Sequence, residues 1–323
     1  MIVGNRAKYA LAKLIADVRP TLFYYRAEGS ARHHLRVRKS GDILEVIDDE
    51  KKKLLRINAG NAVHLPDMIE SFDYYTGSAA PVALRYHGDV YQLTDFSTPR
   101  LHNVTGFADF PVMCPSSTEP FSTTLQYLDF ANLKPGGRVI DLGTYSGLTA
   151  IAFSKEVGAE GRVLALEPDP INFQSAEYNL AMHKAVNGLD NVTLVPLAAS
   201  GEDGELELSS EGTMGSALVS IVGGYRGVTV KVQARTLMSL AREFELGTVD
   251  FVKVDIEGAE KFVVPQSAEF LAKYKPRMLI EGHAVNGVST IEPLVAFLNG
   301  VGYKTRVEAQ EGLKLHLIEA APE

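Results

Sequence analysis

Between residues 122 and 318, short apolar segments alternate with longer segments whose apolar residues recur at helical spacing. The apolar segments are expected to be strands, at Val139–Leu142, Val163–Leu166, Val192–Leu197, Val249–Val254, Met278–Ile280, Tyr303–Val307 and Leu313–Ile318. The helical segments are Ser122–Ala131, Leu148–Val157, Pro170–Val186, Thr236–Glu243 and Ile291–Asn299. This alternation predicts an α/β fold with a mostly parallel, seven-stranded sheet between helices. Only Glu308–Gly312 separates the last two strands, so a terminal strand should be antiparallel.

The N-terminal part of the chain has a different pattern. A helix is expected over residues 7–18, followed by short alternating segments typical of antiparallel strands at Leu35–Arg38, Ile43–Ile47 and Leu54–Ile57. Val82–Tyr86 and Val90–Leu93 flank a tight turn and predict a hairpin. Proline, serine, threonine and asparagine are frequent from residue 96 to residue 120. We therefore expect a smaller α+β domain at residues 1–115, acting as a cap for substrate or in oligomerisation, and a second domain at residues 116–323.

Composition excludes several classes of protein. The 323 residues include 32 Lys and Arg against 40 Asp and Glu, a net charge of -8 that argues against a general nucleic-acid binder. Cys114 is the single cysteine, which rules out an intramolecular disulfide and a cysteine-rich zinc site. No apolar run approaches the roughly 20 residues of a transmembrane helix. A cytoplasmic protein with no nucleic-acid partner and no transmembrane segment is expected.

A glycine turn follows the first strand of the second domain and leads directly into a helix. Its sequence is Asp-Leu-Gly-Thr-Tyr-Ser-Gly over Asp141–Gly147. Gly143 and Gly147 allow a sharp turn and a close approach of a ligand to the backbone. Glu167, at the end of the next strand, is placed to accept both hydroxyls of a ribose. A cofactor with an adenosine part is implied.

The spacing of the glycines in this turn distinguishes between two candidate cofactors, NAD and S-adenosylmethionine. An NAD-binding turn has the pattern Gly-x-Gly-x-x-Gly, whereas this one reads Asp-x-Gly-x-x-x-Gly. S-adenosylmethionine has no pyrophosphate, but its amino group and sulfonium are cationic, so an acidic residue such as Asp141 favours it. S-adenosylmethionine is therefore the predicted cofactor, and an NAD-dependent oxidoreductase is the alternative.

Three segments carry a more specific resemblance. They are Asp141–Gly147, Glu167–Pro170 and above all Val249–Glu260, which reads Val-Asp-Phe-Val-Lys-Val-Asp-Ile-Glu-Gly-Ala-Glu. From about Phe110 to Ile318 the chain resembles the FkbM-type S-adenosylmethionine-dependent methyltransferases. The resemblance implies a class I methyltransferase, Rossmann-like fold that methylates a hydroxyl on a sugar, polyketide or related metabolite. The predicted cofactor-binding residues are Glu119, Asp141, Gly143, Tyr145, Ser146, Gly147, Glu167, Ala198, Ala199 and Asp255.

Candidate catalytic residues lie at the carboxyl ends of the predicted strands, which meet at one sheet edge. His283 is the predicted general base, since its ordinary pKa is near neutrality, although a hydrogen-bonded loop histidine is the alternative. Asp255 could orient cofactor or acceptor, and Lys253 lies on the same strand face, as a catalytic group or in an ion pair with Asp255. Asp255, Glu281 and His283 are also chemically suitable for a divalent cation. Glu260 is interpreted as a helix cap.

The functional hypothesis is an S-adenosylmethionine-dependent O-methyltransferase acting on a small hydroxylated or saccharide-like acceptor. The polar loop over residues 209–216 could close over that acceptor or be a surface turn. Besides the oxidoreductase, a non-catalytic S-adenosylmethionine-binding or assembly protein is an alternative, and its N-terminal domain would supply an interface. That domain is also a candidate for homo-oligomerisation.

Overall fold

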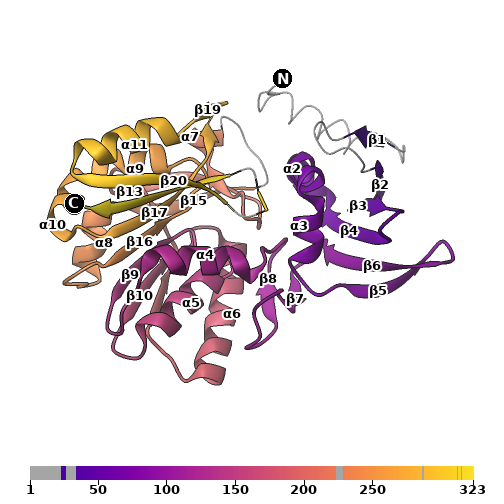
Figure 1. Cartoon of the computed structure of the whole chain (residues 1–323), viewed down its shortest axis with the longest axis horizontal. Helices are drawn as coiled ribbons and strands as arrows, with labels where there is room; N and C mark the ends of the chain where they lie inside the picture. Colours follow the sequence, from indigo (N-terminus) through magenta and orange to yellow (C-terminus); the bar gives the residue numbers. More distant parts are fainter. Residues whose placement is uncertain (1–22, 27–33, 223–227, 286, 311, 314) are drawn as a thin grey trace. The chain divides into compact units, whose positions relative to one another are not determined.

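The computed structural model of the chain describes residues 23–26, 34–222, 228–285, 287–310, 312–313 and 315–323. The chain forms two compact units, Met1–Phe121 and Ser122–Glu323 (Figure 1). The predicted boundary, at residue 115, lies just before the observed one. The helix expected over residues 7–18 lies outside the described residues.

The first unit is built on a six-stranded sheet. Its order is β1 (Phe23–Arg26), β2 (His34–Ser40), β3 (Ile43–Asp48), β4 (Lys53–Asn58), β6 (Asp89–Phe96) and β5 (Val82–Tyr86). Neighbouring strands are antiparallel except β4 and β6. The connection between β4 and β5 contains η1 (Ala59–His64), α2 (Leu65–Glu70) and α3 (Phe72–Gly77), and their apolar residues pack with one face of the sheet. The segment expected to be irregular contains a ribbon of β7 (Arg100–His102) and β8 (Val112–Cys114).

The second unit contains a seven-stranded sheet. The strand order is β11 (Val192–Val195), β10 (Arg162–Leu166), β9 (Arg138–Leu142), β16 (Phe251–Val254), β17 (Arg277–Gly282), β21 (His316–Pro322) and β20 (Tyr303–Ala309). The strands from β11 to β17 are parallel, and β21 pairs antiparallel with both of its neighbours. The prediction of an α/β fold is confirmed. The carboxyl ends of β9, β10, β16 and β17 meet at one edge, where Glu167, Asp255, Glu281 and His283 lie.

Helices supply an apolar core to each face of this sheet. α4 (Phe121–Ala131) and α5 (Leu148–Val157) pack on the face that presents Val139 and Phe251. α8 (Leu237–Glu243), α10 (Ala268–Tyr274) and α11 (Ile291–Gly300) pack on the face that presents Ile140 and Val252. Both faces of the parallel strands are mostly apolar because both are covered, and the paired Asp141 and Lys253 are the buried charged residues within β9 and β16. The remaining long helix, α6 (Pro170–Asn187), starts at Asp169, whose carboxylate caps its first turn.

A second, four-stranded sheet differs from the sequence prediction. Its order is β12 (Leu197–Ala199), β15 (Val228–Arg235), β13 (Gly204–Ser210) and β14 (Ala217–Leu218). The single strand expected over Val192–Leu197 is instead divided into β11 and β12. The division falls at Pro196, which has no N–H to continue a sheet ladder. The short α7 (Val219–Val222) follows β14, and α9 (Glu260–Val263) and η2 (Pro265–Ser267) follow β16.

The last strand, β21, begins three residues later than the Leu313 expected from the sequence. A two-stranded ribbon of β18 (Ala284–Val285) and β19 (Val288–Ser289) lies between β17 and α11.

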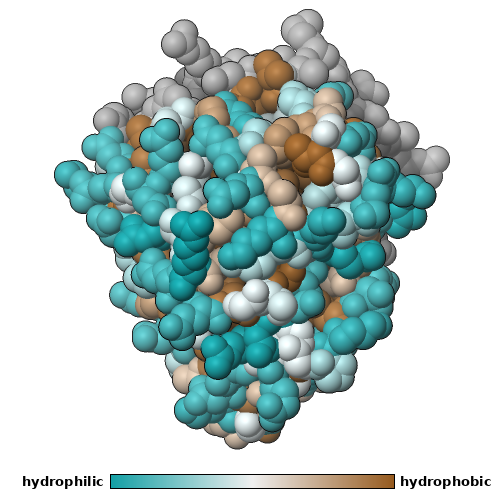
Figure 2. All heavy atoms as spheres, turned by 90° about the vertical axis from the view of Figure 1, so that its left-hand side faces the viewer, coloured by the Kyte–Doolittle hydropathy of each residue, from teal (hydrophilic) through white to brown (hydrophobic). Residues whose placement is uncertain are grey.

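Figure 2 shows a face of the molecule on which hydrophilic residues predominate and hydrophobic residues form smaller groups between them. Among the described helices, none combines the length and the apolar character that a bilayer-crossing helix requires.

Candidate active site

The turn between β9 and α5 is held tightly against the end of β16. Gly143 has φ +75°, and a Cβ atom at this position would overlap the carbonyl oxygen of Asp255. The N–H groups of Gly143 and Thr144 both donate to the carbonyl of Leu166, at 3.1 and 3.0 Å. Gly147, with φ +81°, then leads into α5. Only glycine fits at position 143, because both the backbone conformation and the close approach exclude a side chain.

Glu167 lies at the end of β10 beside this turn. Its carboxylate accepts hydrogen bonds from the backbone N–H groups of Tyr145 (2.8 Å) and Asp169 (2.9 Å). The side chain is buried, and burial, together with the Asp169 carboxylate, raises the pKa of Glu167 to about 8. An ionisable oxygen pair is therefore fixed at the position where the sequence predicts a ribose contact.

Asp141 and Lys253 form a buried ion pair below the turn. The Asp141 carboxylate accepts from Thr149 Oγ1 (2.6 Å), and its other oxygen lies 3.4 Å from Lys253 Nζ. Lys253 also donates to the carbonyl of Gly143 (2.6 Å) and lies 3.3 Å from Asp255. Burial alone would lower the pKa of Lys253, but the carboxylates of Asp255 and Asp141 outweigh burial and raise it. Lys253 therefore stays protonated, which favours the ion-pair interpretation over a catalytic base.

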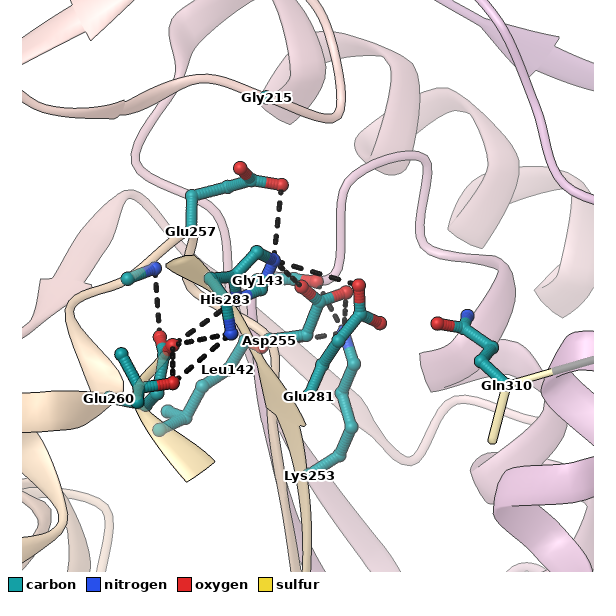
Figure 3. Close-up of polar contacts among 12 residues, drawn as sticks. Leu142, Gly143, Gly215, Lys253, Asp255, Glu257, Glu260, Glu281, His283 and Gln310 are labelled. Atoms are coloured by element: carbon teal, nitrogen blue, oxygen red, sulfur yellow. Dashed lines mark hydrogen bonds and ion pairs between the residues drawn. The ribbon is translucent and has the colours of Figure 1, made fainter. Parts of the chain in front are cut away.

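His283 follows β17 and lies among carboxylates from three elements (Figure 3). Its Nε2 atom is 3.6 Å from Glu257, 3.6 Å from Glu281 and 3.8 Å from Asp255, and its Nδ1 is 3.3 Å from Glu260. Burial alone would lower the pKa of His283, but Glu257 and Glu260 outweigh burial and raise it well above 6.5. An imidazolium has no lone pair for a substrate proton. The charges around His283 therefore do not favour its predicted role as a general base.

Glu260 makes more contacts around His283 than the helix cap predicted from the sequence would make. One oxygen accepts from the N–H of Gly258 (2.8 Å), as a cap would. The other accepts from Thr290 Oγ1 (3.0 Å) and from the backbone N–H of His283 (3.2 Å). Burial alone would raise the pKa of Glu260, but its hydrogen bond with His283 outweighs burial and lowers it. The buried carboxylate thus fixes both the backbone and the ring of His283.

Two further residues complete the cluster, and no sequence pattern connects them to it. Tyr127, on α4, donates its O–H to Glu281 (3.1 Å). Gln310, directly after β20, donates from Nε2 to the Tyr127 oxygen (3.3 Å). Because their separations in sequence are 154 and 183 residues, no local spacing could indicate these contacts.

Comparison with known proteins identifies the family of this chain. The model of the FkbM methyltransferase domain matches residues 141–305. The chain belongs to the FkbM methyltransferase family. The matched region contains the glycine turn, Glu167, Lys253 and every carboxylate around His283. A search of curated proteins found no match.

Two solved structures are similar to this FkbM protein at low sequence identity. The methyltransferase FkbM from Methylobacillus flagellatus KT is 16% identical, with a TM-score of 0.39, over 59% of this chain and 47% of that one. The chain therefore spans about half the length of that relative. The O-methyltransferase from Bacillus cereus in complex with SAH is 12% identical, with a TM-score of 0.40, over 63% of this chain and 82% of that one.

The remaining predicted site residues of the FkbM protein are more dispersed. Ala198 and Ala199 are buried in β12, and Ser146 is buried in the glycine turn. Glu119 belongs to the first unit, so its proposed contact with the cofactor stays a prediction.

The loop before β14 is anchored in the structure. Asp169 Oδ2 accepts from the N–H groups of Glu211 and Gly212, both at 3.1 Å, and from Ser216 Oγ at 2.7 Å. The same Asp169 caps α6 and donates its own N–H to Glu167. The loop is thus connected through one residue, Asp169, to the predicted ribose contact, and sequence alone did not suggest this connection.

Replacing Glu260 with glutamine is expected to destabilise the FkbM domain by about 2 kcal/mol, because an amide cannot replace a buried, charge-assisted acceptor of several bonds. Thermal unfolding followed by circular dichroism should show a melting temperature lower by about 4–8 °C. Glu269→Gln, at an exposed position on α10, is the matched control and should unfold as the parent protein does. Equal melting temperatures for all three proteins would contradict the assigned network.

Proposed function

We propose that this protein transfers the methyl group of S-adenosylmethionine to a hydroxyl oxygen of a small metabolite or saccharide. The observation that carries the proposal is the position of Lys253. Its ammonium group donates to the Gly143 carbonyl of the glycine turn and pairs with Asp255 of the acidic cluster. One buried cation therefore sets the proposed cofactor turn and the proposed reaction centre in a fixed relation.

The residues at the turn fit the proposed cofactor. Glu167 already accepts two backbone N–H groups, yet a carboxylate offers about four acceptor positions, so ribose hydroxyls can still donate to it. Gly143 keeps the turn free of a side chain at its closest approach to β16. The proposed cofactor contacts are those predicted from sequence: Glu119, Asp141, Gly143, Tyr145, Ser146, Gly147, Glu167, Ala198, Ala199 and Asp255. For Asp141 the buried position supports an indirect effect, through Thr149 and Lys253.

The acceptor hydroxyl is placed at Asp255. Its side chain is 28% exposed, whereas Lys253 and Glu260 beside it are almost completely buried. S-adenosylmethionine supplies an electrophilic methyl group on a sulfonium. When the acceptor oxygen takes this methyl group and S-adenosylhomocysteine leaves, the Asp255 carboxylate would accept the hydroxyl proton. His283 and Lys253 are positioning residues in this proposal, because both are charged groups that fix Asp255 from either side.

The first unit is proposed to act as a cap for the substrate or in self-association. It has its own apolar core, which includes Leu44, Leu55 and Phe96. The single cysteine, Cys114, is buried as a free thiol, which accords with the proposed cytoplasmic location. These parts of the proposal do not affect the chemistry assigned to the second unit.

Calorimetric titration with S-adenosylhomocysteine tests the cofactor, with NAD as the parallel ligand. We expect saturable binding of S-adenosylhomocysteine and none of NAD. Transfer of labelled methyl groups from S-adenosylmethionine to a panel of hydroxylated acceptors then tests the reaction. Binding of NAD alone would favour the oxidoreductase alternative. Binding of S-adenosylhomocysteine with no transfer to any acceptor would favour the non-catalytic one.

Glu167→Gln is expected to weaken S-adenosylhomocysteine binding by about 30-fold, since a charge-assisted hydrogen bond to ribose contributes about 2 kcal/mol. Because the pKa of Glu167 is about 8 and ribose hydroxyls donate to the ionised form, affinity should rise about tenfold between pH 7 and pH 9. The glutamine variant should lose that rise. Glu177→Gln, exposed on α6, is the control. An unchanged pH profile in Glu167→Gln would remove Glu167 from the ribose site.

A further inference from the structure

The cluster around His283 has the dimensions of a metal site. One ligand atom each from Asp255, Glu281 and His283 lies within 4.8 Å of the other two. Two ligands bound to one divalent cation at metal–ligand distances of 2.0–2.4 Å lie about 3 to 4.8 Å apart. His283 Nε2 is 3.8 Å from Asp255 Oδ1 and 3.6 Å from Glu281 Oε1, inside this interval.

The charges of the cluster are not balanced by its own basic groups. Asp255, Glu257, Glu260 and Glu281 all lie within 3.8 Å of a nitrogen atom of His283. Lys253 is shared with Asp141 and donates to the Gly143 carbonyl. Two cationic groups, His283 and the shared Lys253, therefore face five carboxylates, of which Asp141, Glu260 and Glu281 are buried. Carboxylates taken out of water are stable only when paired or bound to a cation.

The side chain of Gln310 is independent evidence for a cation site. Its side chain is buried, with only 2% of the residue exposed, and no described group donates a hydrogen bond to Oε1. Figure 3 shows this oxygen directed toward the Glu281 carboxylate. Two acceptors that face each other in a buried space need a donor or a cation between them. The amide oxygen of glutamine is also a suitable ligand for a hard divalent cation, directly or through water.

The outer contacts hold the ligand atoms in the required directions. Glu260 contacts His283 Nδ1, so the other nitrogen, Nε2, faces Asp255 and Glu281. Tyr127 donates to Glu281 Oε2, which leaves Oε1 turned toward His283. Hydrogen bonds of this kind to a ligating imidazole and a ligating carboxylate are the usual support of a metal site.

We propose that Asp255, Glu281 and His283 bind one divalent cation of the Mg²⁺ or Mn²⁺ class, with Gln310 directed toward the same site. The cation takes the place of the proton on His283 Nε2, which leaves to solvent, so that the neutral imidazole can offer its lone pair. Two carboxylates and one imidazole suit these ions, and Mn²⁺ tolerates the imidazole best. The cation binds the acceptor hydroxyl beside Asp255 and makes its proton more acidic, so that Asp255 accepts it more readily. This catalytic role rests on the proposed methyl transfer, whereas cation binding itself does not.

Electron paramagnetic resonance with MnCl₂ tests the site without an activity assay, because the signal of free Mn²⁺ falls as the ion binds. The full chain, freed of metal by a chelator, should bind one Mn²⁺ saturably, and MgCl₂ should compete. Glu281→Gln and Asp255→Asn should each weaken binding at least tenfold. Glu319→Gln is the matched control: it is similarly buried, lies on the adjacent strand β21 and pairs with Arg306 outside the cluster. It should bind Mn²⁺ like the parent.

Circular dichroism and S-adenosylhomocysteine titration of each variant separate a lost site from a lost fold. If Glu281→Gln does not fold, Asp255→Asn alone decides, because its side chain is partly exposed. Failure of the folded parent protein to bind Mn²⁺, or equal binding by parent, Glu281→Gln and Asp255→Asn, would overturn the metal site. Either result alongside S-adenosylhomocysteine binding would leave the proposed methyl transfer standing. Saturable Mn²⁺ binding that both variants lose would support the metal site even if the protein bound no S-adenosylhomocysteine.

Discussion

Gly143→Ala is expected to destabilise the second unit by about 3 kcal/mol and to abolish S-adenosylhomocysteine binding. Two costs combine at this position. An alanine at φ +75° is strained by roughly 1–2 kcal/mol, and its Cβ would overlap the Asp255 carbonyl, which adds an overpacking cost of about 1–3 kcal/mol. The overlap can be relieved only by moving the turn away from β16. That movement would displace both the proposed cofactor contacts and the Lys253 bond to the Gly143 carbonyl.

Gly136→Ala is the matched control for Gly143→Ala. Gly136 also has a positive φ, +83°, but a Cβ atom there would meet no heavy atom within 4 Å. It should therefore cost only the conformational strain, about 1 kcal/mol, and retain binding. Thermal unfolding should separate the two variants by about 4–8 °C, and calorimetry should show binding only by Gly136→Ala. Equal losses of stability would mean that the close approach to Asp255 has no energetic role.

The parts of the fold that could be predicted from sequence are those determined by local patterns. Short, mostly apolar segments at β9, β10 and β16 predicted buried parallel strands, because both faces of each strand pack against helices. Gly143 and Gly147 form the sharp turn predicted for them, and both adopt positive φ values. The ends of β16 and β17 bring Asp255, Glu281 and His283 together, as expected for the carboxyl edge of a parallel sheet.

The four-stranded sheet of the second unit shows what the sequence patterns could not predict. Glu205, Leu206, Glu207 and Leu208 alternate as a half-buried strand should, so a sequence signal for β13 exists but is short. The break between β11 and β12 depends on Pro196, which lies inside an otherwise apolar run. A continuous apolar run indicates burial, but it does not tell in which of two sheets each residue pairs.

The protonation state of the site depended on contacts that no local pattern contains. The ordinary pKa of histidine predicts a base at His283, yet three carboxylates within Asp255–Glu260 and a fourth at Glu281 surround it and favour its charged form. Glu260 appeared to be a cap because its contact with Gly258 is local, whereas its bond to Thr290 is not. Lys253 and Asp141 are paired across neighbouring strands, β16 and β9, which required knowledge of strand order.

Lys253→Met is expected to be the most damaging substitution at the site, with a loss of about 3–5 kcal/mol in the free energy of unfolding. Methionine has a similar length but no charge, so it leaves the completely buried Asp141 side chain without its cation. Removing one partner of a buried ion pair has a cost of this size because the other charge stays out of water. The Gly143 carbonyl also loses its donor, so S-adenosylhomocysteine binding should fall with stability.

A double-mutant cycle with Asp141→Asn distinguishes the ion pair from simple packing. In the double variant Lys253→Met, Asp141→Asn no buried charge remains unpaired, and Asp255 keeps partial access to water. Chemical denaturation should therefore show the double variant about 2 kcal/mol more stable than the sum of the two single losses predicts. Restored stability without restored S-adenosylhomocysteine binding would assign the Lys253 bond to Gly143 directly to cofactor positioning. Strictly additive losses of unfolding free energy would instead show that Lys253 and Asp141 contribute separately to stability. The proposal that Lys253 couples the glycine turn to the acidic cluster would then be wrong.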